Sequence, residues 1–228
     1  MIILAVLFIT LFTRLGYWQV QRADEKAKMV AAEEALAKQE PVNWVIGNKL
    51  PLQYQRIKLK GNYLTNIFLY DNQHYQHHLG YDVLSPLLLA DGSLVMIDRG
   101  WVPGDNTRRT FPSVKTPKGL MQLQGTAYFP SKNQWILGPG LEEKENKTII
   151  LELLDTKMLS QILQKKLYPF IIRLDKQDAY GFVREWAIVS MPPQRHLAYA
   201  LQWFAMALVI LIIFVALNLK KINEKTGN

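Results

Sequence analysis

The hydrophobic run from His196 to Leu219 constrains this 228-residue chain more than any other feature. Between Leu197 and Leu217 the only clearly polar side chain is Gln202. As a helix rising about 1.5 Å per residue, that stretch spans roughly 30 Å, which matches the hydrocarbon core of a bilayer. The sequence therefore predicts a transmembrane helix over residues 196–219.

A second apolar stretch lies at the N-terminus, where we predict a transmembrane helix over residues 1–20. A cleaved signal peptide would carry a basic start and a small-residue cleavage site, and this stretch has neither. Arg14 can extend its aliphatic stem toward the membrane surface, and Tyr17 and Trp18 suit the aromatic belt of a bilayer. No Lys or Arg precedes the span, which leaves open a natural start further upstream.

The charges around the spans predict their orientation. Three lysines follow the second span within residues 220–228, and this excess of positive charge predicts a cytoplasmic basic tail. Two spans place both termini on the cytoplasmic side, so residues 42–193 are expected to form an extracytoplasmic domain. Residues 21–41 between the first span and that domain are mostly strong helix formers up to Pro41, and predict a helical stalk. No Arg- and Ser-rich presequence precedes the chain, which favours a bacterial inner membrane and a periplasmic domain.

The central region carries the patterns of β-strands and one helix. Polar and apolar residues alternate from Arg56 to Lys60, as in a half-buried strand, and Asp91-Gly92 between two apolar runs predicts a hairpin turn. A helix is predicted over Asp155–Lys166, with Asp155 as its N-cap. Its inward-facing residues would be Leu159, Ile162 and Leu163. The further strand candidates are Asn66–Tyr70, Gly80–Leu89, Ser93–Val102, Met121–Phe129, Ile149–Leu153, Phe170–Leu174 and Glu185–Val189.

Two long polar loops, Gly104–Gly119 and Pro130–Lys147, complete this region. The predicted fold class is a membrane α+β protein, in which two transmembrane helices flank a mainly antiparallel β domain with a packed helix. The chain has no cysteine, which excludes disulfides, thiol redox chemistry and a cysteine nucleophile. Its net charge of +8 is scattered among acidic residues without a nucleic-acid-binding motif, so nucleic acid is not an expected partner.

Signals for catalysis and metal binding are weak. His74, His77 and His78 lie in one polar segment, but adjacent histidines on an extended chain point in opposite directions and no paired carboxylate follows. The motifs of serine hydrolases, zinc peptidases and nucleotide-binding enzymes are absent, although a Ser–Lys dyad is an alternative that one sequence leaves open. We therefore predict no metal site, no catalytic residue and no enzyme activity.

The segment Asp98–Pro103 ends a predicted strand with a charge pair, a glycine and a tryptophan. In the structural interpretation, Trp101 caps the sheet and Arg99 pairs with an acid. In the functional interpretation, the segment faces a partner protein.

His196 is the strongest candidate site residue, because an ionisable group at the edge of a span is unusual. Steps of three and four residues place it on one helical face with Tyr199, Trp203 and Met206. A neutral imidazole is a common axial ligand of haem iron, and a nearby arginine, Arg195 or Arg14, could meet a propionate. The alternative is an interfacial histidine beside an ordinary aromatic belt.

Three ordered groups of residues resemble the signatures of a known family. They are Leu15–Arg22 with Glu25-Lys26; Gly80–Leu87 with Asp91-Gly92 and Arg99–Pro103; and His196–Phe204. They resemble the surfeit-locus (Shy-type) family of cytochrome c oxidase assembly proteins. The resemblance implies a membrane factor that assists the delivery or insertion of haem a into oxidase subunit I. In bacterial members the residue matching His196 is associated with haem binding, so the resemblance implies that role for His196 alone.

One departure from the family pattern concerns the residues before this histidine, where many members have Asn-Asn and this chain has Gln194-Arg195. The expected partners are oxidase subunit I, haem a synthase and membrane lipid, with haem a bound transiently. The alternative function is a membrane-anchored docking chaperone that holds subunit I and does not bind haem.

Overall fold

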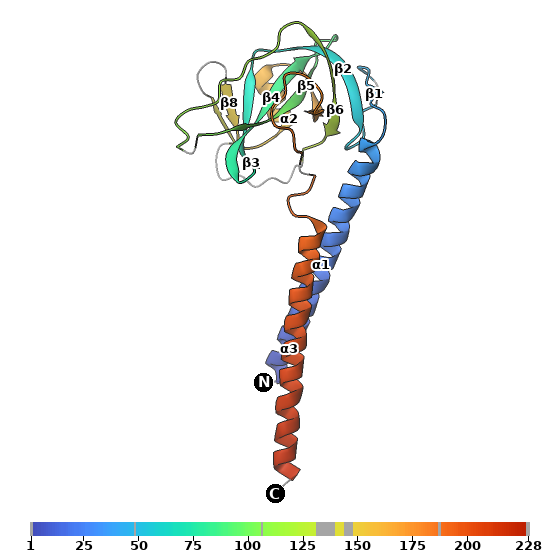
Figure 1. Ribbon diagram of the computed structural model, residues 1–228, viewed down its shortest axis with the longest axis vertical. Coiled ribbons are helices and arrows are strands. Elements are labelled where there is room, and N and C mark those ends of the chain that lie inside the picture. The colour runs from blue at the N-terminus through green and yellow to red at the C-terminus, as the bar shows by residue number, and fades with distance from the viewer. Residues whose placement is uncertain are drawn as a thin grey trace. The chain divides into compact units, whose positions relative to one another are not determined.

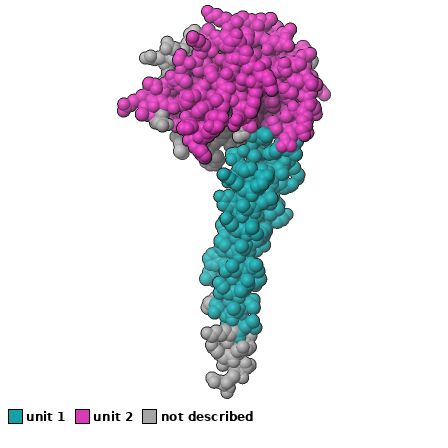
Figure 2. Space-filling view, viewed as in Figure 1, with its two compact units in different colours: residues 1–32, 187–228 teal, residues 33–186 magenta. Residues whose placement is uncertain are grey.

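The computed structural model of this chain describes residues 2–47, 49–105, 107–130, 140–143, 148–186 and 188–226. It contains two compact units, which comprise residues 1–32 with 187–228, and residues 33–186 (Figure 2). Two long helices begin and end the chain: α1 (Ile2–Ala37) and α3 (Pro193–Thr226) (Figure 1). Both are long and apolar enough to cross a membrane by length and composition. Large apolar side chains along both helices are exposed, as expected of surfaces that face lipid.

The unit formed by residues 33–186 is built on one mixed sheet with a short helix (Figure 1). Its strands run in the order β1-β2-β6-β9-β5-β4-β3-β8-β7, and a further pairing of β2 with β4 closes five of them into a ring. Six pairings among the described strands are antiparallel and three are parallel. The strands are β1 (Val42–Asn43), β2 (Arg56–Tyr63), β3 (Ile67–Tyr75), β4 (His78–Leu88), β5 (Leu94–Pro103), β6 (Leu120–Tyr128), β7 (Leu141–Glu143), β8 (Thr148–Leu151) and β9 (Leu167–Leu174).

The predicted fold class is therefore confirmed, with a sheet that is mainly rather than wholly antiparallel. Side chains that alternate along the ring strands fill its interior, which explains the pattern of β2, where Ile57 and Leu59 are buried between the more exposed Arg56, Lys58 and Lys60. A second apolar cluster packs outside the ring, beneath helix α2 (Thr156–Leu163). The unit thus has a filled barrel and a covered outer face.

Local signals in the sequence place several elements correctly. The side chain of Asp155 accepts hydrogen bonds from the backbone N–H groups of Lys157 and Met158, so it is the N-cap of α2. The helix ends before the predicted Lys166 because Gln164 adopts a left-handed conformation at φ 50°. Ile162, predicted to face inward, is exposed, whereas Leu159 is fully buried. The predicted Asp91-Gly92 turn joins β4 to β5, and Gly92 has a positive φ of 81°.

The predicted strand at Glu185–Val189 is wrong for its described residues. The indole N–H of Trp186 donates to the carbonyl of Leu174, and nearby Val183 makes only an isolated bridge to Trp101. The guanidinium of Arg184 donates to the carbonyl of Asp178 and thereby folds the segment onto itself. Side-chain hydrogen bonds replace the strand ladder here.

The segment Asp98–Pro103 has a structural role in this unit. Trp101 covers the end of β3, where its indole N–H donates to the carbonyl of Gln73 at 3.3 Å and its ring lies 5.3 Å from that of Tyr75. Arg99 is buried, and contrary to the prediction no acid in the described part of the chain pairs with it; backbone carbonyls accept its hydrogen bonds instead. Burial lowers the pKa of the Arg99 guanidinium, although arginine starts so high that it stays charged.

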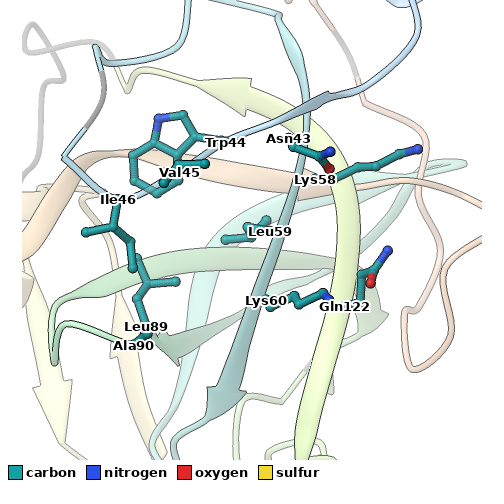
Figure 3. A pocket seen from close by; sticks show the side chains of 10 residues that line it. All are labelled: Asn43, Trp44, Val45, Ile46, Lys58, Leu59, Lys60, Leu89, Ala90 and Gln122. Atoms are coloured by element: carbon teal, nitrogen blue, oxygen red, sulfur yellow. The ribbon is translucent and has the colours of Figure 1, made fainter.

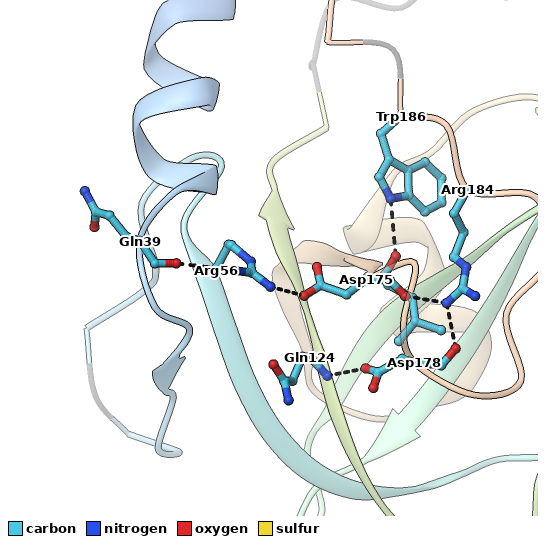
Figure 4. Close-up of polar contacts among 8 residues, drawn as sticks. Gln39, Arg56, Gln124, Asp175, Asp178, Arg184 and Trp186 are labelled. Carbon is cyan, nitrogen blue, oxygen red and sulfur yellow. Dashed lines mark hydrogen bonds and ion pairs between the residues drawn. The ribbon is translucent and has the colours of Figure 1, made fainter.

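The two chain connections of this unit are tied into one polar network (Figure 4). Arg56 on β2 donates to the carbonyl of Gln39, just after α1, and forms an ion pair with Asp175, just after β9. Arg184 and Trp186 also donate to backbone carbonyls at this end of β9. The chain therefore enters and leaves the unit at neighbouring positions, as two consecutive membrane spans on one side would require.

Candidate functional site

His196 lies in the first turn of α3, where Pro193 begins the helix with a preset φ. The side chain is buried, with 8% of its surface exposed. Its Nδ1 atom lies 2.7 Å from the amide oxygen of Gln19 on α1, a hydrogen bond that joins residues 177 positions apart. This hydrogen bond therefore joins the signature group Leu15–Arg22 on α1 to the group His196–Phe204 on α3.

The hydrogen bond to Gln19 determines which nitrogen of the imidazole carries hydrogen. With the amide oxygen of Gln19 facing Nδ1, the matching tautomer is the one that carries hydrogen on Nδ1 and has its lone pair on Nε2. That Nε2 atom is buried and has no hydrogen-bond partner among the described residues. A buried imidazole nitrogen with a free lone pair is the form in which histidine binds a metal.

Small residues bring the two helices close together around this histidine. Gly16 and Ala23 on α1, and Ala200 and Ala207 on α3, are buried at seven-residue intervals, which keep one face of each helix toward the other. A Cβ atom at Gly16 would lie 2.6 Å from the ring of Phe204. Glycine at this position therefore leaves room for the ring of Phe204, one turn before Gln19.

Replacing Gly16 with leucine should separate the helices and lower the stability of the helix pair by about 1–3 kcal/mol, because the new side chain overlaps the ring of Phe204. Adding Phe204→Ala should recover most of that loss, and Phe204→Ala alone serves as the control. Thermal unfolding of the full chain in detergent measures the effect. Equal midpoints for Gly16→Leu and wild type would contradict the close packing.

The predicted aromatic stripe divides between two surfaces. Trp203 is half-buried, and its ring centre lies 5.6 Å from that of Phe12 on α1. Tyr199 and Met206 are instead 44% and 38% exposed. At about 100° per residue, Trp203 returns to within about 20° of His196, whereas Tyr199 and Met206 lie about 60–80° away. α1 therefore covers the face of α3 that carries His196 and Trp203, and leaves Tyr199 and Met206 exposed.

The arginines near His196 lie at the surface. Arg195 and Arg14, the predicted propionate partners, are both exposed. Arg22 stacks over the ring of Trp18 at 5.6 Å and pairs with Glu25 at 2.8 Å. Sequence reasoning did not assign a role to Gln19, although the residue lies inside the signature Leu15–Arg22.

The other three histidines belong to the unit formed by residues 33–186. His74, His77 and His78 lie at the β3–β4 turn and are exposed, and Nδ1 of His74 lies 3.1 Å from the carbonyl of Asn72. Within the described ranges, no group of three or more His, Asp and Glu side chains could hold a metal ion.

Sequence reasoning also missed two carboxyl groups with raised pKa values in the barrel unit, those of the half-buried Asp82 and the buried Asp98. Burial raises the pKa of Asp82 on β4 to about 6, and burial followed by the charge of Asp82 raises the pKa of Asp98 on β5 well above its usual range. The charge of Arg173 on β9 opposes both shifts. The sequence signal for these two groups was an aspartate within each of the apolar strands β4 and β5. Asp98 is only 3% exposed and belongs to the interior, whereas Asp82 is half-buried.

A groove of about 510 Å³ opens at the β1 edge of the barrel unit (Figure 3). Trp44 and Leu89 give it an apolar wall, and Lys58 and Lys60 give it positive charge. No serine is among its described lining residues, so the Ser–Lys dyad that the sequence leaves open is not formed in this groove by those residues. The lining residues are Asn43, Trp44, Val45, Ile46, Lys58, Leu59, Lys60, Leu89, Ala90 and Gln122.

Comparison with known proteins agrees with the ordered signatures. The model of the SURF1 family matches residues 6–208. A SURF1-like protein of Rickettsia conorii is 28% identical over 214 residues, which cover 90% of this chain and 86% of that protein. A SURF1-like protein of Rickettsia felis is 27% identical over 214 residues, which cover 90% of this chain and 91% of that protein. One from Dictyostelium discoideum is 28% identical over 99 residues, or 38% of this chain and 37% of that protein. The match along nearly the whole length shows that this chain belongs to the SURF1 family, a family of oxidase assembly factors.

Proposed function

We propose that this protein assists the delivery or insertion of haem a into subunit I of cytochrome c oxidase, with His196 as an axial ligand of the haem iron. The observation that carries the proposal is the Nε2 atom of His196, which is buried and without a partner among the described residues while Nδ1 is bonded to Gln19. Leaving a buried polar atom unpaired is costly, and such atoms often have a functional reason.

The residues around His196 fit a haem. The porphyrin supplies an iron that accepts a nitrogen ligand and a broad apolar face that needs cover. The exposed surfaces of Tyr199 and Met206 are available for apolar contact, and Arg195 and Arg14 carry the positive charge that carboxylates attract. Because Nε2 is buried, neighbouring side chains must move before a metal can reach it.

The two apolar helices and the lysines after α3 suggest how the protein is oriented in the membrane. We place α1 and α3 across the bacterial inner membrane, with both termini in the cytoplasm beside the lysines of the tail and the barrel unit in the periplasm. His196 then lies in the first turn of α3, at the periplasmic surface of the membrane. The barrel unit would dock on the oxidase, and haem a synthase would supply the haem.

The absorption spectrum of the full chain, purified from a host that makes haem a, tests this function. A Soret band at about one haem per chain is expected. A protein that binds oxidase subunit I but carries no haem would instead support the docking chaperone and overturn haem delivery. For that alternative, the groove between Trp44 and Lys60 is the first surface to test by substitution.

A further inference from the structure

We propose that Gln19 is the positioning residue of His196: it holds the imidazole as the tautomer with hydrogen on Nδ1 and keeps the lone pair of Nε2 free for a metal. The inference rests on the proposed function for its purpose, but the tautomer itself is a property of the protein without haem. No other described hydrogen bond links α1 to the ring of His196.

The hydrogen bond between Gln19 and His196 is short and partly buried, and both properties help it to hold the imidazole ring in place. The distance of 2.7 Å between Nδ1 and the amide oxygen is at the short end for an N–H···O hydrogen bond. Both partners are at least half-buried, and one turn before Gln19 the backbone of Gly16 lies close to the ring of Phe204 on α3. A hydrogen bond to one ring nitrogen fixes which nitrogen can bind a metal and also fixes the orientation of the ring.

The opposite orientation of the Gln19 amide is less favourable. If the amide NH₂ donated to Nδ1, hydrogen would have to sit on Nε2, which is buried without an acceptor. A buried N–H without a partner is rarer in proteins than a buried acceptor without one. The surroundings of Nε2 therefore favour the orientation with the amide oxygen toward Nδ1.

An amide also suits this position better than a carboxylate. Glutamine accepts the hydrogen bond without bringing a charge into an apolar helix interface, where an unpaired carboxylate would be costly.

Nitrogen-15 NMR of the full chain in detergent, labelled at histidine and free of haem, tests the inference. The resonances of His196 are identified by their loss in His196→Ala. Wild type should show hydrogen on Nδ1. Gln19→Met removes the acceptor while keeping a similar shape, and should convert His196 to a mixture of tautomers. Gln21→Met, at an exposed position on the same helix, is the matched control and should leave the spectrum unchanged.

Haem titration of the same variants gives the second measurement. Gln19→Met should weaken haem binding by about 10–100-fold, the usual effect of losing the partner of a histidine ligand. Hydrogen on Nε2 of His196 in wild type, or an unchanged tautomer in Gln19→Met, would overturn the inference. If the NMR spectra of wild type and Gln19→Met are as expected but wild type binds no haem, the positioning role of Gln19 is supported and the proposed haem function fails.

Discussion

Replacing His196 with alanine should abolish the Soret band of the purified protein. The substitution removes the only described ring nitrogen with a buried, unpaired lone pair, and haem affinity should fall by more than about 100-fold, since loss of an outer partner alone costs about 10–100-fold. The fold should survive, because a single described hydrogen bond of this side chain is lost and the barrel unit does not contain His196. Absorption spectra and circular dichroism of the same sample separate these two effects.

Added imidazole provides a sharper version of this test. In His196→Gly, free imidazole can enter the space left by the side chain and restore the axial ligand, so the Soret band should return as imidazole is added. His77→Ala, which alters an exposed histidine at the β3–β4 turn, is the control and should bind haem like wild type. Unchanged haem content and unchanged axial-ligand spectra in His196→Ala would refute the ligand role.

The features that the sequence predicts well are those in which neighbouring residues carry the physical cause. The apolar run of α3, the N-cap at Asp155 and the turn at Asp91-Gly92 each depend on a few adjacent residues. Alternation along Arg56–Lys60 likewise identifies β2 without knowledge of its neighbours. Such features can be predicted because burial or capping is determined within one segment.

The features that the sequence could not predict depend on distant partners. β5 lies parallel to β9, and its partner strand begins more than sixty residues further along the chain. The sequence predicts only that Gln19 belongs to a membrane-spanning helix. The contact of Gln19 with His196 can be found only from the structure. The strand predicted at Glu185–Val189 failed for the same reason, since Trp186 donates its hydrogen bond to Leu174 instead of joining a ladder.

Arg99 makes such a distant contact, and its replacement by leucine should destabilise the barrel unit by about 1.5–3 kcal/mol, the usual contribution of hydrogen bonds to a charged group. Its guanidinium donates through Nε and Nη2 to the carbonyl of Tyr180, at 3.0 and 2.8 Å, and through Nη2 to that of Lys115 at 3.1 Å. Leucine would remove the charged donor from both of these carbonyls, whose hydrogen bonds to Arg99 are partly buried. The rings of Phe182 and Tyr63, 5.0 and 5.6 Å from the guanidinium carbon, would lose their cation as well.

Urea unfolding of the full chain in detergent, followed by tryptophan fluorescence, measures this loss. Arg99→Lys keeps the charge but not the planar array of donors, so its stability should lie between those of wild type and Arg99→Leu. Arg109→Leu, at an exposed position of the loop after β5, should change the stability by less than about 0.5 kcal/mol. If Arg99→Leu were as stable as Arg109→Leu, the segment around Tyr180 would not be held by Arg99. The signature Arg99–Pro103 would then need a role at the surface, in contact with a partner protein.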